Sequence, residues 1–221
     1  MCGIVGGVTN SNITPLLIKG LNKLEYRGYD SSGLIVLSNQ NTFDRARSVG
    51  KVKNLEKNLN DRTKKITGKI GIAHTRWATH GEPSSLNAHP HISKNSVSVV
   101  HNGIIENYIE LKNNQINQGY EFTSDTDTEV IAHAVDSQMN SSNTLIESVQ
   151  KAIKSFEGSY GLGIISSNYP GQVIATRRGS PLVIGIGENG NYIASDQLAL
   201  LSVTKKFIFL KDGDIAEIKL D

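Results

Sequence analysis

CGIVGGV, residues 2–8, opens the chain as a short apolar run with glycines, a composition that predicts a buried strand. Thr14 and Pro15 come next, and apolar residues then recur at helical spacing, which predicts a helix with Pro15 in its first turn. By the same patterns we expect strands at 33–38, 42–48, 69–75, 97–101, 160–166, 172–177, 182–186, 192–194, 207–210 and 215–218, and helices at 52–59, 106–118, 126–139 and 144–156.

The late strands are joined by short connections with turn residues, such as Asn189-Gly190 and Asp212-Gly213, which favour antiparallel hairpins. GIGENG at 185–190 matches a dinucleotide-binding glycine pattern, but a strand follows it instead of a helix, so we expect a hairpin turn there. Strands fall in both halves of the chain, and helices lie between them. The predicted fold is an α+β layered sandwich of two mostly antiparallel sheets covered by helices, formed by one domain over residues 1–221.

The composition argues against several classes of protein. The net charge is only +2 and the basic residues are scattered, so nothing favours nucleic-acid binding. A single cysteine cannot form an internal disulfide, so no oxidising compartment is required. No run approaches the roughly 18 apolar residues that span a bilayer, and the N-terminus lacks a signal-peptide pattern. We therefore expect a cytoplasmic protein that binds neither nucleic acid nor membrane.

Cys2 stands directly after the initiator Met1, and cysteine is small enough for an aminopeptidase to remove that methionine. Processing would leave Cys2 with both a thiol and a free α-amine. This amine has a pKa near about 7.7–8.0, so at neutral pH it can accept the thiol proton. Nucleophile and base would then reside on one residue. The alternative is that a lone cysteine is simply a small buried hydrophobic residue.

HTRWATHG at 74–81 follows an apolar strand and ends in glycine, so its polar side chains lie on a strand end or a loop, where function is common. Arg76 suits a carboxylate, because the planar guanidinium forms two parallel charge-assisted bonds. Thr79 and His80 can add further donors. The structural alternative is a surface arginine beside a core tryptophan, Trp77.

His101, Asn102 and Gly103 end another predicted strand. The Asn102 carboxamide stands beside a backbone N–H that Gly103 leaves sterically open, and these are the parts of an oxyanion hole. The alternative is a turn, which is the more frequent role of an Asn-Gly pair.

SDTDTE at 124–129 has the composition of a helix start, with Thr126 as the cap and Glu129 three residues later. Asp127 at such an N-terminus could equally hold the ammonium group of a ligand. Without other observations, the capping interpretation is the stronger one.

The six histidines raise a metal site as an alternative. His89 and His91 lie close together, as do His74 and His80. No acidic residue stands at a matching spacing, so a metal-dependent hydrolase is the weaker hypothesis, and the sequence predicts no metal ligand.

As a set, six motifs carry a resemblance to a known family. The set resembles the glutaminase domain of the glucosamine-6-phosphate synthases, class II glutamine amidotransferases that are also called glutamine–fructose-6-phosphate aminotransferases (isomerising). The match covers essentially the whole chain and keeps the order of the family's motifs. The motifs are CGIVGG at 2–7, YRGYDSSG at 26–33, GIAHTRWATHG at 71–81, NAHPH at 87–91, VVHNGIIENY at 99–108 and SDTDTEVIAH at 124–133.

The resemblance implies the four-layer αββα sandwich of N-terminal-nucleophile hydrolases, with L-glutamine as substrate and no cofactor. It implies that Cys2 attacks the side-chain amide with its own α-amine as base, and that Asn102 and Gly103 stabilise the oxyanion. Arg27 would brace the nucleophile, and His101 would be a further supporting residue.

The resemblance also implies how the substrate is held. Arg76 would bind the glutamine carboxylate with Thr79 and His80 nearby, and Asp127 would bind the ammonium group. Trp77 would lie in the loop that closes over glutamine and gates the passage of ammonia. A γ-glutamyl thioester would form with loss of ammonia, and water would then release glutamate.

The family's enzymes continue into two sugar-isomerase domains that bind fructose-6-phosphate and receive the ammonia, whereas this chain stops just after DGDIAE at 212–217. We therefore expect an isolated domain that hydrolyses glutamine and cannot make glucosamine-6-phosphate. A homodimer of the full-length form is left open. The non-enzymatic alternative is a glutamine-binding module without activity, but a sensor has no need for a nucleophile.

Overall fold

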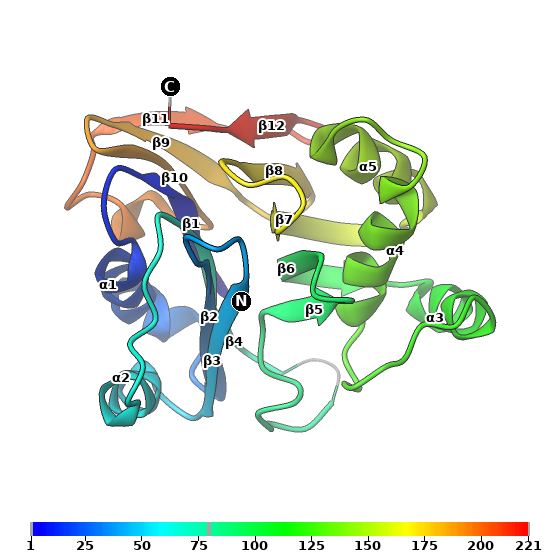
Figure 1. The fold of residues 1–221 in the computed structure, drawn as a ribbon, viewed down its shortest axis with the longest axis horizontal. Coiled ribbons are helices and arrows are strands. Elements are labelled where there is room, and N and C mark those ends of the chain that lie inside the picture. The colour runs from blue at the N-terminus through cyan, green and yellow to red at the C-terminus, as the bar shows by residue number, and fades with distance from the viewer. Residues whose placement is uncertain (1, 79–80, 221) are drawn as a thin grey trace.

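The computed structural model describes residues 2–78 and 81–220, whose strands form a seven-stranded and a five-stranded sheet. The two sheets lie against each other in the middle of the molecule (Figure 1). Helices α1 (Thr14–Leu24) and α2 (Val52–Asp61) cover one outer side, and α4 (Glu129–Met139) and α5 (Leu145–Ala152) cover the other. The predicted αββα sandwich is therefore confirmed.

All pairs between neighbouring strands of the two sheets are antiparallel, as predicted. The seven-stranded sheet has the order β11 (Lys206–Phe209), β9 (Val183–Gly187), β10 (Gly190–Ala194), β1 (Gly3–Thr9), β4 (Ile70–Arg76), β2 (Ser31–Leu37) and β3 (Phe43–Val49). The five-stranded sheet has the order β12 (Ile215–Ile218), β8 (Val173–Arg178), β7 (Gly158–Ser166), β6 (Val97–Ile105) and β5 (His91–Ser93). The remaining helices are α3 (Tyr108–Asn117) and three 3-10 turns at Glu25–Arg27, Ile153–Ser155 and Gln197–Ala199.

The opening strand, β1, lies inside the seven-stranded sheet between β10 and β4. Val5 on one face packs in the cluster beneath α1 and α2, whereas Ile4 on the other face packs in the cluster between the two sheets. A strand that is covered on both faces needs no alternation of apolar and polar residues. This explains why the run at 2–8 is apolar throughout.

Helix α1 forms where the apolar spacing predicts it, with Pro15 in its first turn. Leu17, Leu21 and Leu24 lie on one side of the helix and are buried against the seven-stranded sheet. Proline is tolerated at this end because the first N–H groups of a helix have no partner within the helix.

Two predicted features around the turns have different outcomes. The Asn189-Gly190 connection joins β9 to β10 as an antiparallel hairpin, so the prediction for 185–190 is confirmed. The Asp212-Gly213 turn does not close a hairpin, because β11 belongs to the seven-stranded sheet and β12 to the five-stranded sheet. Local turn chemistry indicates a reversal of the chain, but it does not determine which sheet receives the next strand.

Two element boundaries also differ from the predictions. Strand β6 continues past Asn102 and Gly103 to Ile105, so these residues lie inside a strand and do not form a turn. Helix α4 starts at Glu129, and Thr126 is not its cap. The N-cap position is Thr128, whose hydroxyl bonds to the His101 ring instead of capping the helix. The short strand β5 was not predicted from the sequence.

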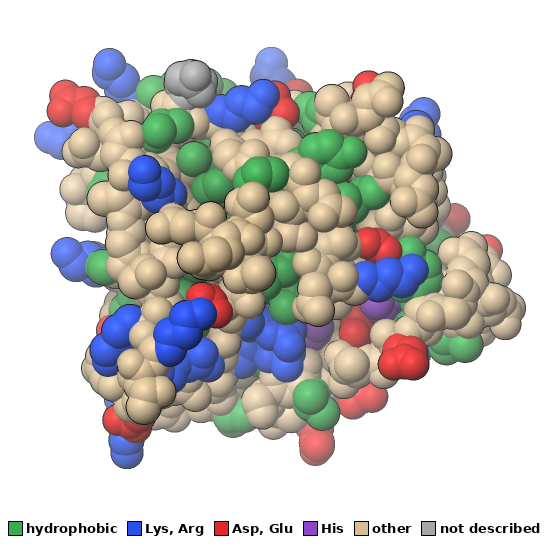
Figure 2. All heavy atoms as spheres, in the orientation of Figure 1, with side chains coloured by type: hydrophobic (Ala, Val, Ile, Leu, Met, Phe, Trp, Pro, Cys, Tyr) green, Lys and Arg blue, Asp and Glu red, His purple; other side chains and the backbone are tan. Residues whose placement is uncertain are grey.

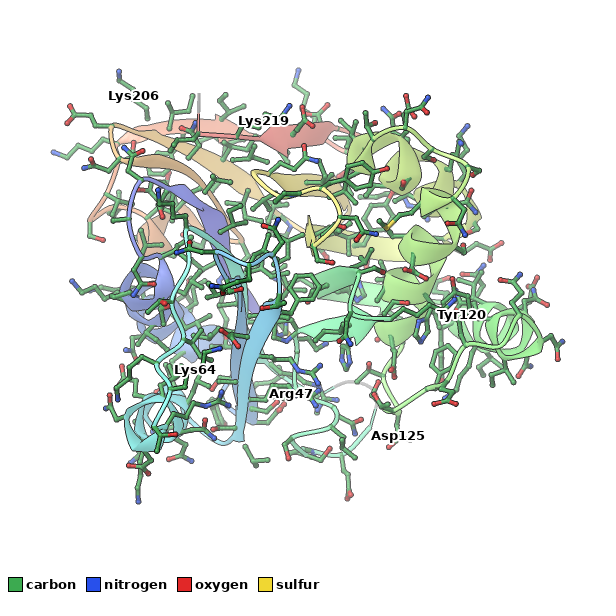
Figure 3. All side chains as sticks on the ribbon, in the orientation of Figure 1. Arg47, Lys64, Tyr120, Asp125, Lys206 and Lys219 are labelled. Carbon is green, nitrogen blue, oxygen red and sulfur yellow. The ribbon has the colours of Figure 1, made fainter. Side chains whose placement is uncertain are left out.

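Basic side chains gather over α2 and β3 in the view of Figure 2, although lysine and arginine are scattered along the sequence. Arg45 donates to the carbonyl oxygen of Pro90, and Arg47 donates to those of Leu86 and Ala88. Arg47, labelled in Figure 3, thus ties the edge strand β3 to the loop before β5. None of the helices in the described part of the chain is both long and apolar enough to span a bilayer.

Candidate active site

Cys2 lies at the start of β1, where the register pairs Gly3 with Thr75 of β4. This pairing brings the cysteine to the end of β4, and the Trp77 N–H donates to Cys2 Sγ over 3.2 Å. The close approach depends on Gly3, because a Cβ atom there would lie 2.6 Å from Thr75 Oγ1 and 2.7 Å from Leu24 Cβ. The thiol is therefore held at the end of a sheet by a backbone N–H.

Burial raises the pKa of the Cys2 thiol above its usual value. The bond from Trp77 N–H and the charge of Arg76 act in the opposite direction, and Asp30 adds to the rise. The net rise means that the thiol is predominantly protonated at neutral pH, so a nucleophilic attack by its sulfur requires a base.

Asn102 reaches Cys2 from the other sheet. Its Nδ2 donates to the Cys2 carbonyl oxygen over 2.9 Å, which places the carboxamide beside the nucleophile. Gly103 follows with a φ of 132°, and a Cβ there would lie 2.1 Å from the carbonyl oxygen of Ser159. No other residue fits at this position without moving β7 away from β6.

The alternative of a surface arginine beside a core tryptophan is wrong for 74–81. Arg76 is buried, and Trp77 is 49% exposed. The Arg76 guanidinium donates to the carbonyl oxygens of Gly81 and Glu82, over 2.9 and 3.3 Å, and lies 3.8 Å from Asp30 Oδ1. Trp77 packs edge to face with Tyr29, with ring centroids 5.6 Å apart. The predictions for Thr79 and His80 lie outside the described residues.

Asp127 is buried ahead of helix α4. Its Oδ2 accepts from the Ile105 N–H over 2.8 Å and lies 3.9 Å from His101 Nδ1. The neighbouring Glu129 accepts from the N–H groups of Thr123 and Ser124 and thereby holds the turn that precedes the helix. The Asp127 carboxylate is thus free of any capping role.

One small cavity of about 20 Å³ connects these groups. Its lining includes five residues that the sequence singled out, together with the supporting residue His101. These residues therefore border a common space, whereas Asn102 is not among the lining residues and contacts the site through the Cys2 carbonyl oxygen. The five are Cys2, Arg76, Trp77, Gly103 and Asp127.

Arg27 has its polar contacts elsewhere. Its guanidinium forms an ion pair with Asp196, with Nη2 and Oδ2 2.7 Å apart, and bonds to the Tyr26 hydroxyl over 3.1 Å. Asp196 follows Ser195, whose hydroxyl accepts from the Ile4 N–H in β1 over 3.0 Å. Through residues 195–196 the Arg27 side chain is connected to β1, the strand that follows Cys2.

Four of the histidines form a buried group at the cavity, and two of them, His89 and His101, belong to its lining. His74 stacks on His89 with ring centroids 4.1 Å apart, and His89 contacts His91 edge to face at 4.8 Å. His101 donates its backbone N–H to His89 Nδ1 over 3.3 Å. Burial lowers the pKa of His74 to about 3 and holds those of His89 and His91 well below the usual value. Nowhere in 2–78 or 81–220 do three His, Cys, Asp or Glu side chains converge as they would around a metal ion.

The comparison with protein families identifies this arrangement. A family model described as a glutamine amidotransferase domain matches residues 74–202, more than half of the chain. The chain belongs to this family. The match begins at His74 and includes Arg76, Asn102, Gly103 and Asp127, so all site residues except those near the N-terminus lie within the matched range.

Curated relatives extend the match of this glutamine amidotransferase domain to nearly its full length. The glutamine–fructose-6-phosphate aminotransferase (isomerising) of Haemophilus influenzae is 55% identical over 99% of this chain. The protein of the same name from Buchnera aphidicola of Acyrthosiphon pisum is 57% identical over 98%. The chain spans 35% of the length of each of these relatives.

A solved structure supports the fold. The glutamine phosphoribosylpyrophosphate amidotransferase of B. subtilis, complexed with ADP and GMP, aligns with a TM-score of 0.83 at 24% identity. The alignment covers 99% of this chain and 47% of that one. At this identity the likeness concerns the arrangement of sheets and helices.

Two residues near the site were missed at the sequence level. Asp30 accepts from the Ala78 N–H and donates its own N–H to the Arg76 carbonyl oxygen over 3.2 Å, so it fixes the backbone on either side of Trp77. His74 bonds to Asn102 across the two sheets. Both stand in motifs that carry the family resemblance, YRGYD and HTRW, and this was the available signal.

Proposed function

We propose that this glutamine amidotransferase domain hydrolyses L-glutamine to glutamate and ammonia through a γ-glutamyl thioester on Cys2. The observation that carries the proposal is the common cavity of Cys2, Gly103, Arg76 and Asp127. Glutamine offers an amide, a carboxylate and an ammonium group. The thiol, the cation and the anion around the cavity match these three groups in kind.

In the first step, Sγ of Cys2 attacks the side-chain carbonyl carbon of glutamine. The raised thiol pKa makes a base necessary. Once Met1 has been removed, the α-amine of Cys2 itself takes the thiol proton, directly or through a water. The charge that develops on the carbonyl oxygen is stabilised by N–H groups of Asn102 and Gly103.

The tetrahedral intermediate then collapses. The carbon–nitrogen bond breaks, the protonated α-amine gives its proton to the departing nitrogen, and ammonia leaves a thioester on Cys2. Water attacks this thioester while the α-amine takes a water proton. The carbon–sulfur bond breaks, the thiol regains its proton, and glutamate is released.

Arg76 and Asp127 are proposed to orient the substrate by its charged end. In the structure the Arg76 guanidinium donates to two loop carbonyl oxygens, and a substrate carboxylate would replace these neutral partners with a charged one. Asp127 accepts one backbone N–H and keeps lone pairs for an ammonium group. Fixing both charges directs the amide toward sulfur.

We further propose that the chain is a single domain of a longer protein. The named activity of the relatives and their greater length support transfer of the ammonia to sugar-isomerase domains that convert fructose-6-phosphate to glucosamine-6-phosphate. The chain alone should then release ammonia from glutamine and form no sugar-phosphate product. A cytoplasmic location and a homodimer of the longer form stay predictions.

Labelling with diazo-oxo-norleucine, an electrophilic mimic of glutamine, tests the proposal. We expect one adduct per chain, and peptide mapping should place it on the N-terminal peptide that begins with Cys2. Excess glutamine should protect against labelling. Intact mass of the unlabelled protein establishes whether Met1 has been removed. Modification at any other residue, or none in a processed sample, would contradict the proposal.

Asn102→Ala is expected to lower kcat for glutamine hydrolysis by about 10²–10³-fold, the usual effect of removing one oxyanion donor. KM should change little, because the charged end of the substrate is held by other residues. Asn107→Ala is a matched control, since that asparagine also donates to a backbone carbonyl oxygen, over 2.9 Å, but the carbonyl belongs to Ser155 and not to Cys2. Steady-state assays of glutamate release measure both variants. A kcat of Asn102→Ala equal to that of Asn107→Ala would contradict the oxyanion role of Asn102.

Two alternatives have specific tests. A metal-dependent hydrolase would lose activity in the presence of a chelator, whereas the proposed thioester route is indifferent to chelation. A glutamine-binding module without activity would bind glutamine and release no glutamate. Neither alternative is favoured by an observation in the described part of the chain.

A further inference from the structure

His74 forms a hydrogen bond between the two sheets. It lies on β4 of the seven-stranded sheet, where the register pairs it with Ile4 of β1. Its Nε2 is 3.0 Å from Asn102 Oδ1 and 3.0 Å from the His101 carbonyl oxygen, both on β6 of the five-stranded sheet. The His74 imidazole therefore joins β4, the neighbour of β1, to β6, the strand that carries Asn102.

The partners of His74 determine where its proton lies. A backbone carbonyl oxygen can only accept, so Nε2 must carry the hydrogen. The same N–H then faces an oxygen of Asn102, which fixes the carboxamide with its NH2 group on the opposite side. That group donates to the Cys2 carbonyl oxygen over 2.9 Å. Turning the amide over would place two donors together at His74 and two acceptors together at Cys2.

The ring of His74 has no freedom to release this amide. Only 1% of the residue is exposed, and its face is stacked on His89 with planes 13° apart. Nδ1 is buried without a hydrogen-bond partner in the described structure, and a ring with its one proton on Nε2 leaves no N–H group unpaired there. Burial keeps the pKa near 3, so the ring keeps this form at neutral pH.

We propose that His74 is a positioning residue for the reaction: its Nε2–H holds the Asn102 carboxamide with the NH2 group turned toward the nucleophile. This inference rests on the proposed function, because it assigns Asn102 to the oxyanion. Neither His74 nor Asn102 is a lining residue of the cavity, and the hydrogen bonds run from His74 to Asn102 and from Asn102 to Cys2. We therefore expect His74 to act through Asn102, so that loss of its hydrogen bond lowers kcat and leaves substrate binding unchanged.

Two substitutions of similar polarity separate this role from simple packing. In His74→Gln, the amide N–H group can occupy the place of Nε2, whereas in His74→Asn it ends near the place of Nδ1 and cannot reach Asn102. We expect His74→Asn to lower kcat about 10- to 100-fold, less than loss of the donor itself, and His74→Gln to stay within about 5-fold. KM should stay within about 3-fold in both. Equal losses in the two variants, or a loss confined to KM, would overturn the inference.

A double-mutant cycle gives the decisive readout. If His74 acts only through Asn102, then His74→Asn should cost less than about 3-fold when added to Asn102→Ala, because residues that act as a unit are not additive. Losses that multiply in the double variant would show an independent structural role and reject the proposal.

The wild-type protein provides a test that needs no variant. Nitrogen-15 spectra of the histidine rings should show His74 as the neutral Nε2–H tautomer at neutral pH, and the Nδ1–H tautomer would overturn the proposal. Cys2 labelling by diazo-oxo-norleucine is measured in parallel. Absent labelling in a processed wild-type sample refutes the proposed function, whereas normal labelling with undiminished kcat in His74→Asn refutes only the role of His74.

Discussion

Cys2→Ala is expected to abolish glutamine hydrolysis, with kcat lower by about five to six orders of magnitude, as for other enzymes that lose their nucleophile. No other described side chain can replace the sulfur, because this is the only cysteine in the chain. The remaining oxyanion donors cannot form a covalent intermediate. Glutamate release in a coupled assay, with purified enzyme at high concentration, provides the necessary range.

Binding and stability distinguish this loss from misfolding. Arg76 and Asp127 are unchanged in Cys2→Ala, so glutamine should still bind, with an affinity within a few-fold of the parent by calorimetry. The thermal midpoint should shift little, since Cys2 is only partly buried and alanine also allows removal of Met1. Hydrolysis at near-normal rate in this variant would mean that another group is the nucleophile and that the proposed thioester does not form.

The layered fold was predictable because its signals are local. A continuous apolar run in β1, helical spacing in α1 and turn residues at Asn189-Gly190 each act within a few residues. The assignment of strands to sheets was not predictable in this way. β11 and β12 follow each other closely, yet the chain crosses from one sheet to the other between them, a choice made by packing over the whole core.

The candidate site shows the same division. Cys2 and Arg76 could be singled out because thiol chemistry and carboxylate binding depend on the residue type itself. The hydrogen bonds between site residues could not be predicted from the sequence, because His74 contacts Asn102 only after the two sheets have packed together. Thr126 illustrates the opposite error: its motif has the form of a helix cap, but its hydroxyl bonds to Ser124 and His91 in the folded chain.

The buried histidines connect the site to the stability of the fold. His74, His89 and His91 lie at the junction of the two sheets, and each is almost fully buried. Burial lowers all three pKa values, with neighbouring histidines and Arg47 as further causes. A neutral ring can supply one donor and one acceptor at this junction without adding charge, which suits a site that already holds Arg76 and Asp127.

We therefore expect the free energy of unfolding to fall by several kcal/mol between about pH 7.5 and about pH 5.5, with each of the three histidines contributing on the order of 1 kcal/mol. In the unfolded chain these histidines take up protons below about pH 6.5, whereas in the folded chain they stay neutral. Stability rises with pH wherever the unfolded state binds more protons. The contribution of the histidines is therefore complete above about pH 6.5 and is lost as the pH falls below that value. Burial also lowers the pKa of His133, which acts in the same direction and pH range, whereas the lowered pKa of Asp196 acts in a more acidic range.

Urea unfolding followed by circular dichroism at a series of pH values measures this slope. His91→Gln provides the control, because it removes one of the three groups and leaves the thiol and its partners in place. Whatever the variant's absolute stability, its free energy of unfolding should depend less steeply on pH, by on the order of 1 kcal/mol per pH unit below about pH 6. A variant with the parent's slope would show that His91 takes up its proton in the folded state. A parent protein whose stability is flat across this range would show the same for all three histidines. The two sheets would then meet at a charged junction, and the neutral Nε2–H form of His74 could not be the one that orients Asn102.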